Sequence, residues 1–316
     1  MTPGGRSSQR REATQSRLLR WDGKSPAPRD AHAETRGAAP NAPSAGGSAR
    51  PFLKWAGGKS RLLPQLQPLL PRADSYSRYL EPFLGSAALF FELRPKEAVL
   101  ADVNHEIVEC YQAIRSCPEK VIRALAQHEY EAEHYYRVRS AGPSRSLAAR
   151  AARTIYLNKT GYNGLYRVNR AGRFNVPMGR YVNPGFRSPL LFATLRACSH
   201  ALAAADIVPG DFEQVLARAC AGDFVYLDPP YVPVSATSDF TSYAAGGFGW
   251  EDQQRLAAAC RSLSERGVKI MLSNSDTPSV RALYRGFHVT RVLAARSINS
   301  KATKRGQVGE VVVRNY

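Results

Sequence analysis

The chain has 316 residues, which is enough to bury a sizeable core in one large domain or in one domain with an insertion. Its 44 Lys+Arg outnumber its 26 Asp+Glu, and the net charge of +18 favours polyanionic partners, nucleic acid above all. The five cysteines are scattered without Cys-x-x-Cys spacing, and no apolar run is as long as a membrane span. We therefore expect a cytoplasmic protein without disulfides, membrane helix or metal.

The first 50 residues have the composition of a disordered basic tail. They are rich in Ala, Arg, Gly, Ser and Pro, so they bury too little apolar surface to offset chain entropy. They hold nine Lys/Arg and four Asp/Glu, which leaves +13 of the total +18 for residues 51–316. The basic character therefore belongs mainly to the part that we expect to fold.

From residue 51 onward, short apolar runs alternate with segments of helical spacing. Strands that alternate with helices predict a mainly parallel sheet covered on both faces, so the fold class is α/β. The predicted strands are Arg78–Phe83, Ala98–Val103, Asp206–Val208, Phe224–Leu227, Val268–Leu272, Val289–Leu293 and Val311–Val313. Helices are predicted over Gln253–Leu263 and over most of residues 105–160. The Gly/Asn/Arg/Tyr-rich segment 158–189 has no core pattern and is interpreted as an inserted recognition element.

A first candidate site follows the first predicted strand. Gly85 and its small neighbours predict a turn that lets a cofactor approach the backbone, and the N-terminus of the next helix favours an anionic group. About twenty residues further on, Asp102 closes the second strand, where nucleoside-binding folds place the acid that bonds ribose hydroxyls. The pair indicates a nucleoside cofactor, with a plain strand–helix connection as the alternative.

A second candidate site is Phe224-Val-Tyr-Leu-Asp-Pro-Pro-Tyr231. Pro229 and Pro230 cannot donate ladder hydrogen bonds and must end the strand, which holds Asp228 and Tyr231 at the carboxyl edge of the sheet. An exocyclic amino group is a poor nucleophile because its lone pair is delocalised. Acceptors from Asp228 and the Pro229 carbonyl would favour a pyramidal nitrogen, and the Tyr231 ring is suited to stack on a flipped base. The alternative is a strand-ending turn with a surface aromatic.

In this motif order, residues 51–316 resemble the adenine-specific DNA methyltransferases of the Dam type. The resemblance implies a Rossmann-like S-adenosylmethionine-dependent fold, with a mainly parallel seven-stranded sheet and an inserted, mostly helical DNA-recognition domain that carries a β-hairpin. It implies a catalytic domain of residues 51–104 and 200–316 and an insertion of residues 105–199. It further implies methyl transfer to adenine N6 in double-stranded DNA, within GATC, after base flipping; we expect a monomer in solution.

The resemblance also assigns residues to the catalytic and cofactor sites. The matches to the catalytic motif are Asp228, Pro229, Pro230 and Tyr231. The expected cofactor contacts are Trp55, Ala56, Gly57, Lys59, Glu81, Pro82, Phe83, Gly85, Asp102, Asp211, Phe212 and Asp228. Within this set, Asp102 is expected on the ribose and the pair Asp211-Phe212 on the adenine ring.

The stretches 158–169 and 172–181 resemble the target-recognition hairpin of the GATC-methylating members. The expected DNA contacts are Lys54, Tyr162, Asn163, Leu165, Arg167, Asn169, Pro177 and Arg180. By this likeness Tyr162 wedges or stacks at the site and Arg167 reads a guanine, which suits the bidentate bonding of Arg to guanine O6 and N7. Arg170 and Arg173, like Arg180, are expected on phosphates. A surface hairpin with solvated arginines is the alternative.

Two residues depart from the family pattern. Ala87 stands where relatives commonly have Gly, which would tighten the cofactor approach unless φ stays negative. Ser275 stands where the family often has His, and we expect its strand-end role to survive. The basic stretch 296–305 is expected to contact the DNA backbone, with a solvated loop as the alternative.

The leading hypothesis is therefore a DNA adenine N6-methyltransferase that works by direct displacement. N4-cytosine methylation stays open, because the catalytic motif also serves that amino group. RNA methylation is less favoured because of the hairpin. A silent DNA-binding module is disfavoured, since it has no need of an intact Asp228 and Tyr231.

Overall fold

The computed structural model describes residues 47–232, 247–295 and 307–316, all within one compact unit of the chain. Most of the predicted tail and the predicted basic loop at 296–305 lie outside the described residues. Among the described residues, no helix is long and apolar enough to cross a membrane. All five cysteines are described and are free.

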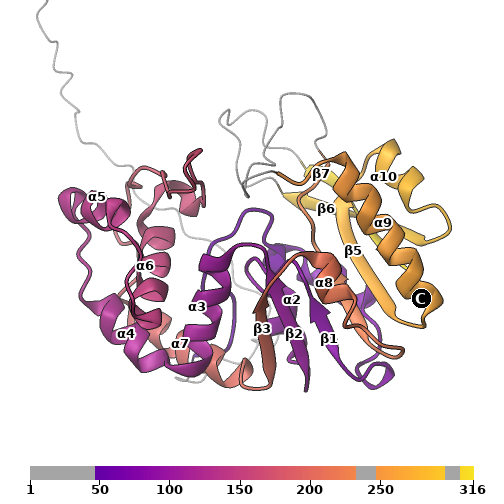
Figure 1. Cartoon of the computed structure of the whole chain (residues 1–316), viewed down its shortest axis with the longest axis horizontal. Helices are drawn as coiled ribbons and strands as arrows, with labels where there is room; N and C mark the ends of the chain where they lie inside the picture. Colours follow the sequence, from indigo (N-terminus) through magenta and orange to yellow (C-terminus); the bar gives the residue numbers. More distant parts are fainter. Residues whose placement is uncertain (1–46, 233–246, 296–306) are drawn as a thin grey trace, which may run out of the picture. The chain divides into compact units, whose positions relative to one another are not determined.

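A seven-stranded sheet forms the centre of the fold (Figure 1). Its strands are β1 (Tyr79–Glu81), β2 (Ala98–Asp102), β3 (Ala205–Pro209), β4 (Phe224–Leu227), β5 (Lys269–Ser275), β6 (His288–Ala295) and β7 (Gln307–Arg314). The order across the sheet is β3-β2-β1-β4-β5-β7-β6. Neighbours from β3 to β5 pair in parallel, whereas β7 runs antiparallel to both β5 and β6. The predicted strands are confirmed, with shifted ends, and the sheet is mainly parallel as expected.

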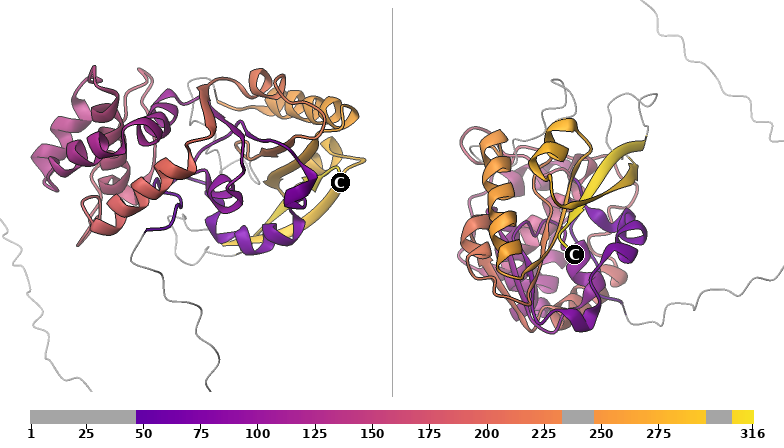
Figure 2. Two further views of the ribbon diagram at one scale, coloured as in Figure 1. Left: turned by 90° about the horizontal axis from the view of Figure 1, so that it is seen from below. Right: turned by 90° about the vertical axis from the view of Figure 1, so that its right-hand side faces the viewer.

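Helices cover both faces of the sheet, and strand side chains alternate between two cores. Tyr79 and Leu100 point to the core that contains α1, α2 and α3, whereas Leu80 and Val225 point to the core that contains α8, α9 and α10. In the right-hand view of Figure 2, α9 and the N-terminal helices lie on opposite sides of the strands. The helices are η1 (Lys59–Arg61), α1 (Leu63–Leu66), η2 (Gln67–Leu69), η3 (Ala73–Ser75), α2 (Ala88–Leu93), α3 (His105–Ser116), α4 (Pro118–Ala126), α5 (Ala132–Ser140), α6 (Leu147–Thr160), η4 (Tyr162–Gly164), α7 (Pro189–Ala201), α8 (Phe212–Leu216), α9 (Trp250–Glu265) and α10 (Pro278–Leu283).

Between β2 and β3 the chain forms α3 to α7, which gather beside the sheet (Figure 1). The helices predicted within residues 105–160 are thus confirmed. The expected hairpin has antiparallel arms but only two isolated bridges, Gly161↔Met178 and Val168↔Phe174. Continuous strands are interrupted because Asn163 and Gly164 take left-handed φ values of 54° and 63°. The predicted boundary at 199/200 falls inside α7.

The chain order reverses between β1 and β4, which are neighbours at the centre of the sheet. From β1 the chain builds outward to β2 and β3, and from β4 it builds outward in the other direction to β5. A crevice at such a switch point, outside the carboxyl ends of the strands, is the usual ligand site of open α/β sheets. The ends of β1, β2 and β4 carry Glu81, Asp102 and Asp228 to this edge.

Candidate active site

A tight turn places Lys59 against Asp228. Gly58 N donates to the Trp55 carbonyl over 3.1 Å. Gly57 has a φ of 75°, the left-handed conformation that a type II turn needs at its third residue. The chain therefore reverses, and Lys59 Nζ lies 2.7 Å from Asp228 Oδ1 and 2.8 Å from Oδ2. The two predicted segments, far apart in the sequence, meet in one ion pair.

Tyr231 lies against this ion pair and links it to Glu310, an acid that was not predicted from the sequence. The Tyr231 hydroxyl donates to Glu310 Oε2 on β7 over 2.8 Å. Lys59 Nζ lies 4.8 Å from the centroid of the Tyr231 ring, a cation–π contact. The ring of the catalytic motif is therefore oriented from both sides, by Glu310 and by Lys59.

Burial raises the pKa values of the carboxylates around Lys59. It raises the pKa of Asp228, and the charge and hydrogen bond of Lys59 oppose that rise. It also raises the pKa of Glu310, again against the charge of Lys59. For Glu81, which is 2% exposed and accepts from the Tyr79 hydroxyl, burial raises the pKa well above its usual range. Asp228 and Glu310 thus share the Lys59 cation, and a cluster of perturbed acids is typical of functional sites.

The glycine turn is built around Trp55 and Asp102. Gly85 has a φ of 45°, and a Cβ there would lie 2.8 Å from Trp55 Cδ1, so only glycine fits. The Asp102 carboxylate accepts from Gly85 N over 3.1 Å and from Asn104 N over 2.9 Å. Burial raises the pKa of Asp102 to about 6, and these backbone hydrogen bonds oppose the rise. Ala87, predicted to tighten the cofactor approach unless φ stays negative, has a positive φ of 53°.

The predicted adenine-ring pair lies at the start of α8. Asp211 caps this helix, because its Oδ1 accepts from Glu213 N over 2.9 Å. Phe212 is buried and stacks on Phe83, with ring centroids 5.7 Å apart. The Phe248 ring, which precedes α9, packs edge-on against Phe83 at 5.7 Å. These three rings form an apolar wall beside the glycine turn.

The predicted DNA contacts lie mostly on exposed positions of the hairpin. Tyr162 is 52% exposed, and its backbone N–H donates to the Pro177 carbonyl over 2.9 Å. Arg167 is exposed, and its Nε donates to Asn175 Oδ1 over 2.7 Å, which fixes the plane of the guanidinium. Asn169 is also exposed, and its Oδ1 closes the hairpin tip by accepting from two backbone amides.

The remaining predicted DNA contacts of the hairpin differ in how exposed their side chains are. Asn163, Pro177 and Arg180 are exposed, whereas Leu165 is partly buried against the core.

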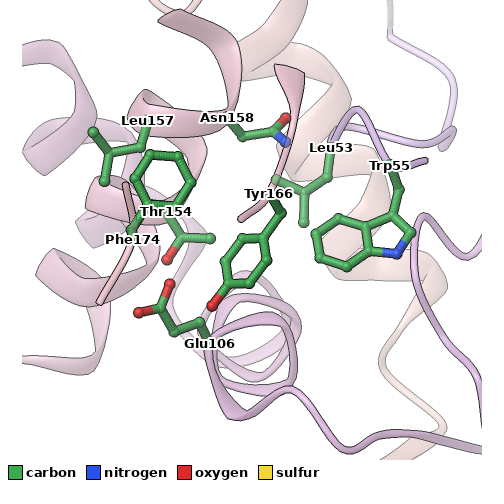
Figure 3. A pocket seen from close by; sticks show the side chains of 8 residues that line it. All are labelled: Leu53, Trp55, Glu106, Thr154, Leu157, Asn158, Tyr166 and Phe174. Atoms are coloured by element: carbon green, nitrogen blue, oxygen red, sulfur yellow. The ribbon is translucent and has the colours of Figure 1, made fainter. Parts of the chain in front are cut away.

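Asn158 of α6 joins this hairpin to the segment around Lys54, next to the predicted cofactor residues. Its Oδ1 accepts from Lys54 N over 2.8 Å, and its Nδ2 donates to the carbonyls of Lys54 at 2.7 Å and Gly164 at 3.3 Å. The Lys54 ammonium lies 4.6 Å from the ring centroid of Tyr181. On the inner side of the hairpin, the Tyr166 ring lies between Trp55 and Phe174 and lines a small apolar pocket (Figure 3).

The structure thus brings the catalytic motif, Lys59 and the glycine turn to one edge of the sheet, and it places the hairpin on the adjoining helices. It also adds polar residues that were not predicted from the sequence. These are Glu310 of β7, Gln253 of α9 and Asn274 of β5. Gln253 alone carried a signal, because it shares its helix face with the buried Leu256, Ala257 and Cys260.

An α/β sheet with a reversed final strand and an Asp-Pro-Pro-Tyr turn at its switch point defines a methyltransferase-type enzyme. The family model for the D12 class N6 adenine-specific DNA methyltransferase matches residues 55–298. The type II methyltransferase M1.LlaDCHI of Lactococcus lactis subsp. cremoris is 43% identical over 274 residues, which cover 84% of this chain and 95% of that protein. The type II methyltransferase M.MjaIII of Methanocaldococcus jannaschii is 39% identical over 289 residues, covering 84% and 99%. The DNA adenine methylase of Escherichia coli K12 is 34% identical over 268 residues, covering 83% and 94%.

The chain belongs to the D12 class of N6 adenine-specific DNA methyltransferases. It is an adenine-specific DNA methyltransferase, and DNA is its substrate. The hypotheses of N4-cytosine methylation and of a silent binding module are set aside by this membership.

Proposed function

We propose that this enzyme uses S-adenosylmethionine to methylate adenine N6 within GATC, as a monomer of the cytoplasm. The observation that carries the chemistry is the state of Asp228. Its Oδ1 is buried and is ion-paired with Lys59 Nζ at 2.7 Å, but within the described part of the chain no well-directed hydrogen bond reaches it. A carboxylate oxygen has two lone pairs, so this buried atom keeps acceptor capacity for a ligand. An amino group of a flipped base supplies the missing donor.

Asp228 and the Pro229 carbonyl would bind the two N–H groups of adenine N6. Accepting both hydrogens favours a pyramidal nitrogen, whose lone pair is then available for attack. The negative charge of Asp228 stabilises the positive charge that develops on N6 as its bond to the methyl group forms. The proton that N6 then loses has an acceptor in the same carboxylate. Tyr231, oriented by Glu310 and Lys59, would stack on the flipped base.

The residues at the glycine turn fit the methyl donor. Bound S-adenosylmethionine would supply an electrophilic methyl group on a positively charged sulfur. Asp102 keeps unused lone pairs for ribose hydroxyls, since each oxygen accepts one backbone N–H. The apolar wall of Phe83, Phe212 and Phe248 suits a purine ring. The other proposed cofactor contacts are Trp55, Ala56, Gly57, Lys59, Glu81, Pro82, Gly85 and Asp211.

We assign residues 105–199 to target recognition and residues 51–104 and 200–316 to catalysis. Support for this assignment comes from the exposed hairpin, where the guanidinium of Arg167 is held in a fixed plane by Asn175. A fixed plane suits bidentate bonding to a guanine edge. The choice of GATC rests on the resemblance of this hairpin to that of the GATC-methylating enzymes.

The test is to incubate the purified chain with methyl-labelled S-adenosylmethionine and unmethylated duplexes that contain GATC or a scrambled site. We expect N6-methyladenine after nucleoside digestion, in the GATC duplex only. Equal labelling of both duplexes would refute the site, and no labelling from S-adenosylmethionine would refute the donor. The variant Asp228→Ala should bind the donor while its turnover is lost, and unimpaired turnover would remove Asp228 from this role.

A further inference from the structure

Two buried amide side chains hold the backbone that follows Pro229. Gln253 of α9 is 2% exposed and Asn274 of β5 is 0% exposed. Gln253 Nε2 donates to the Pro230 carbonyl over 2.8 Å. Asn274 Nδ2 in turn donates to Gln253 Oε1 over 2.9 Å. A chain of hydrogen bonds therefore runs from the sheet, through a helix on its face, to the catalytic motif.

Backbone donors fix the direction of this chain. Asn274 Oδ1 accepts from Ser275 N over 2.8 Å and from Val232 N over 3.3 Å. Because a backbone N–H can only donate, the oxygen of Asn274 must face these two groups and its amino group must face Gln253. Gln253 then presents its oxygen to Asn274 and its amino group to the Pro230 carbonyl.

The same network occupies the carbonyls on the far side of Pro229 but not that of Pro229 itself. Ser275 Oγ donates to the Val232 carbonyl over 2.8 Å, and Gln253 occupies the Pro230 carbonyl. Within the ranges that the structure describes, no hydrogen bond reaches the Pro229 carbonyl. The carbonyls of Pro230 and Val232 are thus satisfied inside the protein, and the Pro229 carbonyl remains available next to Asp228.

We propose that Gln253 and Asn274 are positioning residues for methyl transfer, which clamp residues 230–232 so that the Pro229 carbonyl and the Asp228 carboxylate engage one amino group together. This inference rests on the proposed function, in which those two oxygens accept the two N6 hydrogens. Two acceptors aimed at one nitrogen must be held to a fraction of an ångström, because small misplacements cost large factors in rate. Neither amide touches the reacting atoms, so both act through the backbone that they hold.

The test uses the full chain and measures single-turnover methylation of a GATC duplex with excess enzyme and S-adenosylmethionine. In Gln253→Ala and Gln253→Met, we expect the rate to fall about ten- to a hundredfold, the range of one lost buried hydrogen bond. The KM values for the donor and the duplex should stay within about twofold, because binding groups are untouched. Gln253→Met keeps the side-chain length without a donor, so it separates positioning from a cavity.

The control is Gln254→Ala, the exposed neighbour on the same helix, which should match wild type. Asn274→Ala should slow methylation at least as much as Gln253→Ala. The double variant should be no slower than Asn274→Ala, because the two amides act in series. Circular dichroism and thermal unfolding check that each variant is folded.

A folded Gln253→Met that methylates at the wild-type rate would overturn the inference, as would a raised KM for the duplex with an unchanged rate. Wild type is measured in parallel. A wild-type enzyme that yields no N6-methyladenine would overturn the proposed function itself, so the two failures are distinguishable.

Discussion

At Ala87 the backbone has a φ of 53°, at the turn that begins α2. A left-handed φ costs an L-residue about 1–2 kcal/mol, and glycine avoids this cost at a smaller entropic one. We therefore expect Ala87→Gly to raise the free energy of unfolding by about 0.5–1 kcal/mol. Denaturant titration measures this free energy of unfolding. The control is Ala88→Gly at the first residue of the helix, where glycine should lower stability by about 1 kcal/mol. Equal destabilisation by both variants would contradict the strain at Ala87.

The pH dependence of methylation reports the ion pair between Lys59 and Asp228. The Lys59 charge opposes the burial that raises the pKa of Asp228, so Lys59→Met should raise that pKa further. A carboxylate that must be ionised to accept from N6 then gains its charge at higher pH. We expect the acid limb of the single-turnover rate, measured from about pH 5 to 9, to move to higher pH.

Lys59→Arg keeps the cation and should leave the acid limb near its wild-type position. Glu310 also faces Lys59 and titrates with a raised pKa, so the double variant Lys59→Met/Glu310→Gln separates the two acids. If the acid limb disappears in the double variant, Glu310 and not Asp228 sets it, because the substituted amide cannot titrate; a limb that persists belongs to Asp228.

Among the elements, the strands could be predicted because their two buried faces make them apolar runs. The Asp-Pro-Pro-Tyr turn was equally visible, since two prolines must end β4. The antiparallel insertion of β7 between β5 and β6 could not be predicted, because strand order depends on pairing between segments far apart in the sequence. Glu310 reaches Tyr231 only through that order.

Gln253 and Asn274 escaped prediction for the same reason. Gln253 is polar on an otherwise apolar helix face and Asn274 lies between two buried serines, but their partners are the Pro230 carbonyl and each other, 23 and 21 residues away. Contacts across such separations leave no local pattern. The sequence thus predicted a chemistry for the site, whereas the residues that support its backbone became visible only in the packing of α9 on β5.

Asn158 of α6 bonds to the two segments that we propose to contact DNA, and this predicts the effect of Asn158→Ala. The substitution leaves Lys54 N, Lys54 O and the Gly164 carbonyl without a partner in a site where Asn158 is 5% exposed. We expect a loss of about 2–4 kcal/mol in the free energy of unfolding, from unsatisfied buried groups. DNA affinity should fall as well, because Lys54 and the hairpin lose a common anchor. Binding titrations below the unfolding temperature check this.

The matched control is Asn183→Ala, whose Oδ1 accepts only from Gly185 N at an exposed turn. It should leave both stability and DNA affinity near wild type. Wild-type affinity in a folded but destabilised Asn158→Ala would show that the anchor serves stability alone.

For the whole molecule, we expect the net charge of +18 to contribute affinity for DNA and the hairpin to contribute sequence choice. Phosphate contacts give affinity that weakens with salt, and base contacts give sequence choice. The charge follows from the composition, and the residue types of the hairpin predicted that it recognises bases. The structure adds that Arg167 is held by Asn175, whereas Arg180 is exposed and forms no ion pair within the described ranges. The two arginines should therefore behave differently when removed.

Arg167→Ala should weaken binding by about 1–3 kcal/mol on the GATC duplex and by much less on a scrambled duplex. The preference for GATC is therefore relaxed, while the salt dependence of binding changes little. Arg180→Ala should weaken both duplexes alike and reduce the slope of log affinity against log salt by about one. Equilibrium titrations of both duplexes between about 50 and 200 mM salt measure the two quantities. Equal losses on both duplexes for Arg167→Ala would assign Arg167 to the phosphates, and an unchanged slope for Arg180→Ala would remove Arg180 from them. Because the net charge changes by the same amount in both variants, any difference between them reflects position and not total charge.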